Sequence, residues 1–285
     1  MVSVAVPSMT PHSRLDAALA LARDYALGRQ CANGGFSFYR NDYLEEPSPH
    51  DTWHALAALR LLGTSPPREE DIFRFIIDQP VTAQPYALYF RVRSLGLLEA
   101  ADPEHAAVRA AVAALTTPIP DLASTDDPND ALTHLRLVLW LKRHFGLSFQ
   151  ARGMAQSLLA SEHSDGGFGV PPNLIATRLV LAVLVLCEAH PSARTEAFVA
   201  RMATPGFGFR LTAGPLAPNL EITCAGISCC QRLNLPIAHA ADAQAFILDC
   251  QTGGGFARAP DALPDLALTH LALAGLEVLA GPLYS

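Results

Sequence analysis

Two kinds of helical segment alternate along the chain, and they differ in the spacing of their hydrophobic positions. The first kind is apolar on one side only: in 13–29, Leu15, Ala18 and Ala22 recur along one face of a helix. The second kind, such as 173–189, is apolar almost all round and must be covered on every side. The six predicted pairs are 13–29 with 51–62, 69–77 with 84–98, 104–115 with 129–144, 149–160 with 173–189, 193–202 with 219–233, and 240–250 with 265–280. No segment has the pattern of a convincing β-strand.

The loop ahead of the second helix is also repeated. Paired glycines followed by phenylalanine occur at 34–36, 166–168 and 254–256, and a related Gly-Phe-Gly-Phe occurs at 206–209. The following helix carries a threonine each time, and a fifth copy has a threonine after a degenerate loop. The five threonines, of which the last four are 44 to 46 residues apart, are Thr52, Thr133, Thr177, Thr223 and Thr269. A period this regular indicates a repeat architecture.

The residues of these loops have identifiable physical roles. Paired glycines permit positive φ and a close approach of two backbones, and the phenylalanine can fill the gap between neighbouring hairpins. A proline followed by asparagine or aspartate precedes four of the apolar helices. Because such a side chain accepts a hydrogen bond from a free backbone N–H, we predict helix N-caps. The four predicted caps are Asn129, Asn173, Asn219 and Asp265.

Six pairs at a fixed step predict an all-α protein that closes into an α/α toroid, also called an α6/α6 barrel. The more apolar helices would surround a central cavity, and the amphipathic helices would cover them. An open solenoid is the alternative, but solenoids usually need polar caps at both ends, and the last apolar segment runs almost to the C-terminus. The repeats continue without a linker or charge block, so we expect one domain, 13–285, after a tail of residues 1–12.

Charge and composition narrow the range of functions. The net charge is −7 and Lys142 is the only lysine, which argues against a surface for nucleic acid or an anionic membrane. No apolar run approaches the length of a transmembrane span, and the N-terminus lacks the features of a signal peptide. The six cysteines form no disulfide framework, so we expect buried thiols and a cytoplasmic location.

The Gly-Gly-Phe loops, each followed by an acid or amide, a threonine and an apolar helix, resemble the repeats of protein prenyltransferase β subunits and of terpene cyclases such as squalene–hopene cyclase. The resemblance covers essentially the whole chain. It implies an isoprenoid or isoprenoid diphosphate held in an apolar cavity. Since prenyltransferase β subunits work with a helical-repeat α subunit, it also implies a protein partner on the outer helices.

The zinc site of those β subunits has no intact counterpart. The resemblance places its ligands at Glu221, Thr223 and Leu268, and only the glutamate is a usual zinc ligand. Cys224 and His270 stand one or two positions away and would face other directions, because each residue turns a helix by about 100°. We therefore expect no metal ligand and no cofactor, although Mg²⁺ would accompany a bound diphosphate.

The acid motif of terpene cyclases is also incomplete. In those enzymes the middle aspartate of Asp-x-Asp-Asp protonates an alkene, and the best match here is His50-Asp51-Thr52, with one acid. A carboxylic acid can do this only where a dry site and a partner keep its proton available. An aspartate at a helix start more often interacts with the helix dipole. Both roles are open for Asp51.

When the repeats are aligned, the position directly after each threonine carries side chains that could contact a ligand. In the second repeat Leu88 stands in place of the threonine. We call this set of equivalent positions the column. Its members are Trp53, Tyr89, His134, Arg178, Cys224 and His270. Rotation by the repeat would bring them to one level of the cavity, where aromatic rings can stabilise a carbocation and arginine and histidine can hold a diphosphate. The alternative is that the column faces between helices. Three arginines on nearby helix faces are secondary candidates: Arg91, Arg93 and Arg136.

The leading hypothesis is an isoprenoid-processing enzyme of the prenyltransferase or terpene-cyclase type. The candidate catalytic residues are Asp51, His134 and His270. The candidate substrate-binding residues are Trp53, Tyr89, Arg93, Arg178, Glu221 and Cys224. The alternatives are a class II-type cyclase with Asp51 as general acid, and a catalytically silent toroid that binds a lipid or a protein. A glycoside-processing toroid would need paired carboxylates, for which the inner helices offer only Asp51 and Glu221.

Overall fold

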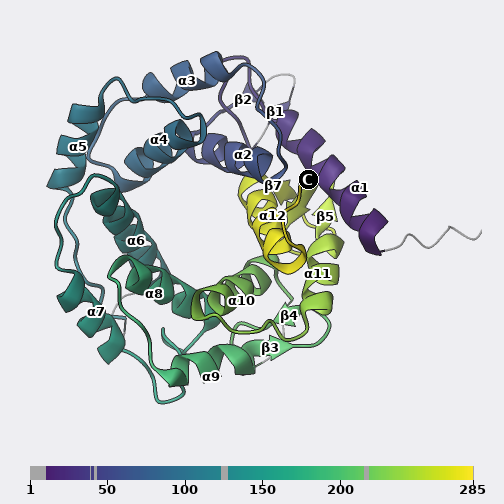
Figure 1. The fold of residues 1–285 in the computed structure, drawn as a ribbon. Coiled ribbons are helices and arrows are strands. Elements are labelled where there is room, and N and C mark those ends of the chain that lie inside the picture. The colour runs from purple at the N-terminus through teal and green to yellow at the C-terminus, as the bar shows by residue number, and fades with distance from the viewer. Residues whose placement is uncertain (1–10, 39, 42–43, 123–127, 215–217, 285) are drawn as a thin grey trace, which may run out of the picture.

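Six helical hairpins close into a ring (Figure 1). The computed structural model describes residues 11–38, 40–41, 44–122, 128–214 and 218–284. The outer ring consists of α1 (Pro11–Leu27), α3 (Glu69–Ile77), α5 (His105–Ala114), α7 (Ala151–Ala160), α9 (Ala193–Met202) and α11 (Ala240–Asp249). The inner ring consists of α2 (Pro49–Leu61), α4 (Pro85–Leu97), α6 (Pro128–His144), α8 (Leu174–Leu186), α10 (Leu220–Leu233) and α12 (Leu266–Ala280). The predicted α/α toroid is confirmed.

Helix boundaries follow the predicted pairs, whereas the prediction of no strands is wrong. Helices α3 and α9 span the predicted residues, and α1 begins at Pro11, inside the predicted tail. In two of the three ladders, glycines with positive φ turn the chain back between strands: Gly206 (87°) between β3 and β4, and Gly254 (89°) between β5 and β6. These short antiparallel ladders are β1 (Arg40–Asn41) with β2 (Leu44–Glu45), β3 (Ala203–Thr204) with β4 (Gly208–Phe209), and β5 (Gln251–Thr252) with β6 (Gly255–Ala257) and β7 (Pro264–Asp265).

The repeated threonine attaches each glycine loop to its inner helix. The backbone N–H of Phe168 donates to Thr177 Oγ1 at 3.2 Å, and the same bond recurs at 3.0 Å in the first and last repeats. Thr223 differs, because its hydroxyl donates to the carbonyl of Phe207. The loop phenylalanines Phe36, Phe168, Phe209 and Phe256 are completely buried. Removing each ring from water stabilises the fold by roughly 2–3 kcal/mol.

The paired glycines set the distance from one repeat to the next. Gly34 and Gly166 both have φ of 91°. A Cβ on Gly34 would lie 2.3 Å from the carbonyl carbon of Asp71, in the first turn of α3, and a Cβ on Gly166 would lie 2.1 Å from the Arg194 oxygen of α9. Both the backbone conformation and the space therefore require glycine, and each loop stacks on the next outer helix.

Three of the four predicted N-caps are confirmed. Asn173 accepts from the N–H of Ala176, Asn219 from Glu221, and Asp265 from Leu268. Asn129 is not an N-cap, because α6 begins at Pro128 and Asn129 lies inside its first turn. Ser48 caps α2 by accepting from the N–H of Asp51.

Contacts between the first and last repeats close the ring. The side chain of Gln251 donates to the carbonyl of Ala18 in α1 at 2.8 Å, and the Tyr25 hydroxyl donates to the carbonyl of Pro264 at 3.1 Å. Helix α12 packs against α2 as the other inner helices pack on their neighbours (Figure 1). An open solenoid is therefore excluded.

The six cysteines are all buried free thiols, as predicted. Five of them, Cys187, Cys224, Cys229, Cys230 and Cys250, belong to one apolar core that joins the later repeats to α1 and α2. Within the described part of the chain, no helix combines the length and apolar character needed to cross a bilayer.

Candidate functional site

The inner helices keep one side accessible to solvent, and we call this side the inner face. Part-exposed residues recur at helical spacing, as in Ile175 and Arg178 of α8 and in Ala267, His270 and Ala274 of α12. The remaining sides of these helices are buried against outer helices and neighbouring inner helices. The inner face is therefore where a ligand can meet several repeats at once.

Aromatic rings from four inner helices meet here; His50, His54, Trp140 and His270 are part-exposed, whereas Trp53, Tyr89 and Phe90 are buried. We define the aromatic cluster as His50, Trp53, His54, Tyr89, Phe90, Trp140 and His270. The ring centre of Trp53 lies 5.0 Å from that of His270, 5.6 Å from Phe90 and 6.0 Å from Tyr89. Tyr89 in turn lies 5.1 Å from Trp140 of α6. Three members of the predicted column (Trp53, Tyr89 and His270) are thus brought together.

Two arginines lie over the rings of this cluster. The guanidinium of Arg93 is 5.2 Å from the ring centres of both Trp53 and Trp140, and that of Arg136 is 5.6 Å from Tyr89. These distances are typical of cation–π contacts. The Arg136 Nε and the indole nitrogen of Trp53 are buried, and neither finds an acceptor among the described residues. Buried donors nearly always have an acceptor, so these two nitrogens require an explanation.

A third arginine continues the positive charge onto α8. Burial lowers the pKa of Arg178, and the positive charges of Arg136 and Arg232 lower it further, against an opposing effect of two nearby thiols. The pKa of Arg232 is lowered by burial and by Arg136. An anion placed between these guanidinium groups would relieve their mutual repulsion and be attracted to all of them.

His54, which the sequence did not single out, pairs with His270. Their Nδ1 atoms are 3.1 Å apart, so one ring must donate and the other accept. Burial lowers the pKa of His54 to about 2, with further lowering by His270, His50 and Arg136. Burial and Arg93 lower the pKa of His270 to about 4. Both rings are therefore neutral at pH 7.

Asp51 is held at the start of α2 by several hydrogen bonds. Its carboxylate accepts from the backbone N–H of Phe38 at 3.2 Å and from the Ser48 hydroxyl at 2.9 Å, and it lies 3.1 Å from His50 Nδ1. Burial acts to raise the pKa of Asp51, but the hydrogen bonds from His50 and Ser48 outweigh it and the net pKa is lowered. A lowered pKa is the opposite of what an alkene-protonating acid needs.

The remaining predicted residues lie apart from the cluster. His134 is part-exposed on α6, and among the described residues the ring contacts of the cluster do not include it. Glu221 forms an ion pair with Arg258 at 3.0 Å. Cys224 is buried between α10 and α12, where its sulfur packs against Gly275, and burial raises the pKa of its thiol. Cys224 is thus an unreactive core thiol.

The positions of the prenyltransferase zinc ligands do not fit a metal here. The Glu221 carboxylate is taken by Arg258, the Thr223 hydroxyl donates to a backbone carbonyl, and Leu268 has no donor atom. In the part of the chain that the structure describes, no three histidine, cysteine or acidic side chains converge as metal ligands would.

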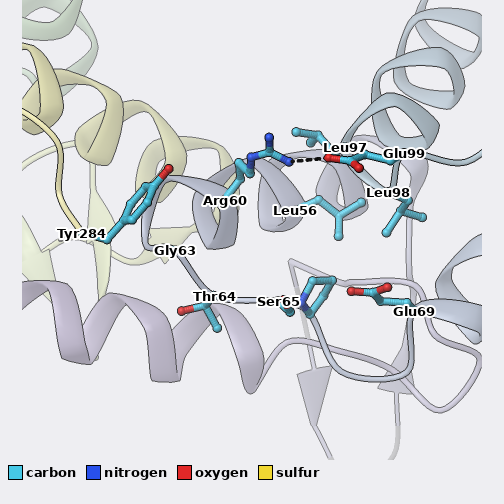
Figure 2. Close-up of a pocket in the computed structure, with 11 residues that line it drawn as sticks. Leu56, Arg60, Gly63, Thr64, Ser65, Glu69, Leu97, Leu98, Glu99 and Tyr284 are labelled. Carbon is cyan, nitrogen blue, oxygen red and sulfur yellow. Dashed lines mark ion pairs between the residues drawn. The ribbon is translucent and has the colours of Figure 1, made fainter.

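A separate pocket of about 490 Å³ lies at the C-terminal ends of α2 and α4 (Figure 2). Two of its three charged groups, Arg60 and Glu99, pair with each other at 3.6 Å and are both exposed; the third is Glu69. The ring of Tyr284 packs over Gly63 at one end of it. None of the predicted site residues lines this pocket.

Comparisons with known proteins agree with this fold. Residues 223–283 match the family described as prenyltransferase alpha-alpha toroid domain. A Candida albicans protein geranylgeranyltransferase-I complexed with GGPP has a TM-score of 0.61 at 14% identity, over 81% of this chain and 83% of that chain. A type II terpene cyclase from Scytonema, in complex with geranylgeranyl dihydroxybenzoate, has a TM-score of 0.58 at 15% identity, over 95% and 98%. No curated protein sequence matches significantly. The predicted resemblance is thus confirmed as a likeness of fold.

Proposed function

We propose that this chain binds an isoprenoid diphosphate on its inner face and acts on it. The hydrocarbon chain lies against the aromatic cluster, and the diphosphate lies between Arg136 and Arg178. The observation that carries the proposal is the pair of buried donors, Arg136 Nε and Trp53 Nε1, which lack an acceptor within the described residues. A diphosphate supplies acceptor oxygens and negative charge together.

The ligands named for the two structural neighbours suggest which chain length to test first. One neighbour was complexed with GGPP and the other with geranylgeranyl dihydroxybenzoate. Both ligands carry a geranylgeranyl group. We therefore propose geranylgeranyl diphosphate as the first ligand for this chain.

The arrangement suits ionisation of an allylic diphosphate. The C–O bond breaks with its electron pair staying on the diphosphate oxygen, whose charge the arginines stabilise. The allylic cation faces the rings of Trp53 and Tyr89, which stabilise it by cation–π interaction. A nucleophile then attacks the cation, or a neighbouring carbon loses a proton. The histidine that donates through Nδ1 in the His54–His270 pair retains an Nε2 lone pair that can accept this proton.

Asp51 fits this scheme as an acid in the first turn of α2, hydrogen-bonded to the capping residue Ser48, rather than as the initiating acid. Its carboxylate is ionised and already accepts hydrogen bonds from Phe38 and Ser48. Cyclisation started by protonation from Asp51 is therefore the weaker candidate. A silent lipid-binding toroid is the second candidate function, and the zinc-ligand positions that do not fit a metal motivate it. A protein partner on the outer helices stays a prediction.

Intrinsic fluorescence tests binding directly, because the chain has only two tryptophans and both belong to the aromatic cluster. Titration with geranylgeranyl diphosphate, with and without Mg²⁺, should change the emission and saturate. Geranylgeraniol and inorganic diphosphate separate the contributions of chain and head group. Arg178→Gln should weaken binding of the diphosphate about tenfold or more but leave geranylgeraniol unchanged. The matched control is Arg152→Gln on the outer helix α7, where the arginine is exposed.

Product analysis separates the enzyme from the silent toroid. Incubation with radiolabelled geranylgeranyl diphosphate should yield a labelled hydrocarbon, alcohol or transfer product and free diphosphate. Saturable binding with no product over many hours would favour the silent toroid. Loss of both binding and product would overturn the proposal itself.

A further inference from the structure

The second repeat differs from the others in the loop before its inner helix. Asp78-Gln-Pro80 stands in place of Gly-Gly-Phe, and Leu88 stands at the position of the repeated threonine. The loop therefore inserts no phenylalanine beside α4, whereas the loop phenylalanines of four other repeats are completely buried. The threonine-to-loop hydrogen bond is also absent at Leu88, which has no side-chain acceptor.

Arg91 replaces the missing connection between repeats. Its Nη1 donates to the carbonyl of Gln79 at 3.0 Å, at the end of α3. Its Nε and Nη2 donate to Asp102 at 2.7 and 2.8 Å, and Nη2 also donates to Glu104 at 3.0 Å, just before α5. The guanidinium is only 4% exposed. This secondary candidate of the sequence is thus a structural residue that joins the second repeat to the third, and its donors are occupied.

A pocket of about 120 Å³ lies beneath this divergent loop. Its walls are mostly apolar and come from the end of α3, the loop, the start of α2 and one face of α4. They include Pro49, Ile76, Pro80, Val81, Leu88 and Phe90. Pro80 and Thr82, on the loop side, are exposed. The pocket is therefore apolar inside and accessible from the loop.

One polar group of this pocket is unsatisfied. Ser94 lines the pocket from α4 and is only 1% exposed. Its Oγ has no hydrogen-bond partner among the described residues. Buried hydroxyls nearly always have a partner, so this one requires an explanation. A serine hydroxyl can both donate and accept, so a ligand with one hydroxyl group would satisfy it.

We propose that this pocket is a binding site for a small aromatic alcohol of the size of phenol. An apolar cavity of about 150 Å³ in another protein holds benzene. This pocket, at about 120 Å³, is somewhat smaller, but it is open at Pro80 and Thr82, so one aromatic ring enters it with one edge at the opening. The ring contacts the apolar walls, and its hydroxyl meets Ser94 Oγ. Phe90 forms a wall of the pocket and also contacts Trp53 and His50 of the aromatic cluster. The site is nevertheless distinct from the proposed diphosphate site and does not depend on it.

Fluorine NMR with 4-fluorophenol tests the site, with 4-fluorotoluene as the probe that lacks the hydroxyl. Both probes should bind the wild-type protein, and 4-fluorophenol should bind more tightly. Ser94→Ala should weaken 4-fluorophenol binding about threefold to tenfold, the equivalent of one net hydrogen bond, and leave 4-fluorotoluene unchanged. Ser161→Ala, after α7, is the matched control and should change neither.

Leu88→Phe provides a second, independent variant, because a phenylalanine there fills the pocket from the threonine position. It should abolish binding of both probes while the far-UV circular dichroism spectrum stays that of a folded helical protein. Failure of both probes to bind the wild-type protein would overturn the proposal. Equal binding to the wild-type, Ser94→Ala and Leu88→Phe proteins would also overturn it, because the probes would then occupy another surface such as the aromatic cluster.

Discussion

His54 of the first inner helix and His270 of the last inner helix approach to 3.1 Å between their Nδ1 atoms. The pair lies where the two ends of the repeat array meet, since α2 packs against α12. It joins residues that are 216 positions apart in the sequence. The same contact thus helps close the ring and contributes two neutral imidazoles to the aromatic cluster.

This pair predicts that stability falls in mild acid. Both folded-state pKa values, about 2 for His54 and about 4 for His270, lie below the ordinary value of 6.5. The unfolded chain therefore binds more protons below pH 6.5, and the stability present above that pH is lost as the pH falls toward 4. The loss is at most about 1.4 kcal/mol per pH unit for each histidine. Urea unfolding at pH 7.5, 6.5, 5.5 and 4.5 measures it. Replacing both histidines by glutamine should flatten this dependence, and an unchanged slope would contradict the assignment.

The threonine-to-loop bond predicts a specific cost for Thr177→Val. This substitution keeps the shape of the side chain but leaves the buried N–H of Phe168 without its acceptor. An unsatisfied buried donor costs about 1–3 kcal/mol, which urea unfolding would register as a lower midpoint. Thr116→Val, at an exposed position after α5, is the control and should change the free energy of unfolding by less than about 0.5 kcal/mol.

The stacking of glycine loops on outer helices can be separated from backbone strain. Gly166 and Gly206 have similar φ, 91° and 87°, but a Cβ on Gly206 would meet nothing within 4 Å. Gly206→Ala should therefore cost only the strain, about 1–2 kcal/mol. Gly166→Ala adds a clash with the carbonyl of Arg194 and should cost several kcal/mol more or prevent folding. If both substitutions lowered the free energy of unfolding by the same amount, the close approach of Gly166 to α9 would not contribute to stability.

Asp51→Asn distinguishes a structural acid in the first turn of α2 from a catalytic acid. Asparagine can still accept hydrogen bonds from Phe38 and Ser48, so stability should fall by only about 0.5–1 kcal/mol. Binding of geranylgeranyl diphosphate and the rate of product formation should change less than about threefold. Normal binding with product formation reduced by orders of magnitude would instead assign Asp51 the role of general acid.

The sequence by itself determined the helix pairs and three of the N-caps, and it predicted the closed toroid from the number and regular step of the pairs. The pairs and caps are local: an all-round apolar helix, a Gly-Gly-Phe loop and an asparagine before a helix carry their physical meaning within a single hairpin. It also identified Trp53, Tyr89 and His270, because a regular repeat places equivalent positions at one level, and it named Arg93 as a secondary candidate on a nearby helix face. The capping prediction failed only at Asn129, which lies one residue inside α6.

Only the tertiary structure decided which of those side chains meet and what they do. His54 pairs with His270 only because small rotations between six repeats add up to a closed ring, and no local pattern records that sum. Arg91 became a structural connection because its partners Asp102 and Glu104 lie beyond the helix end, on the approach to the next repeat. Glu221 likewise forms its ion pair with Arg258, which belongs to the neighbouring repeat. The pKa of Asp51 likewise depends on Phe38 and Ser48, which the folded loop brings to it.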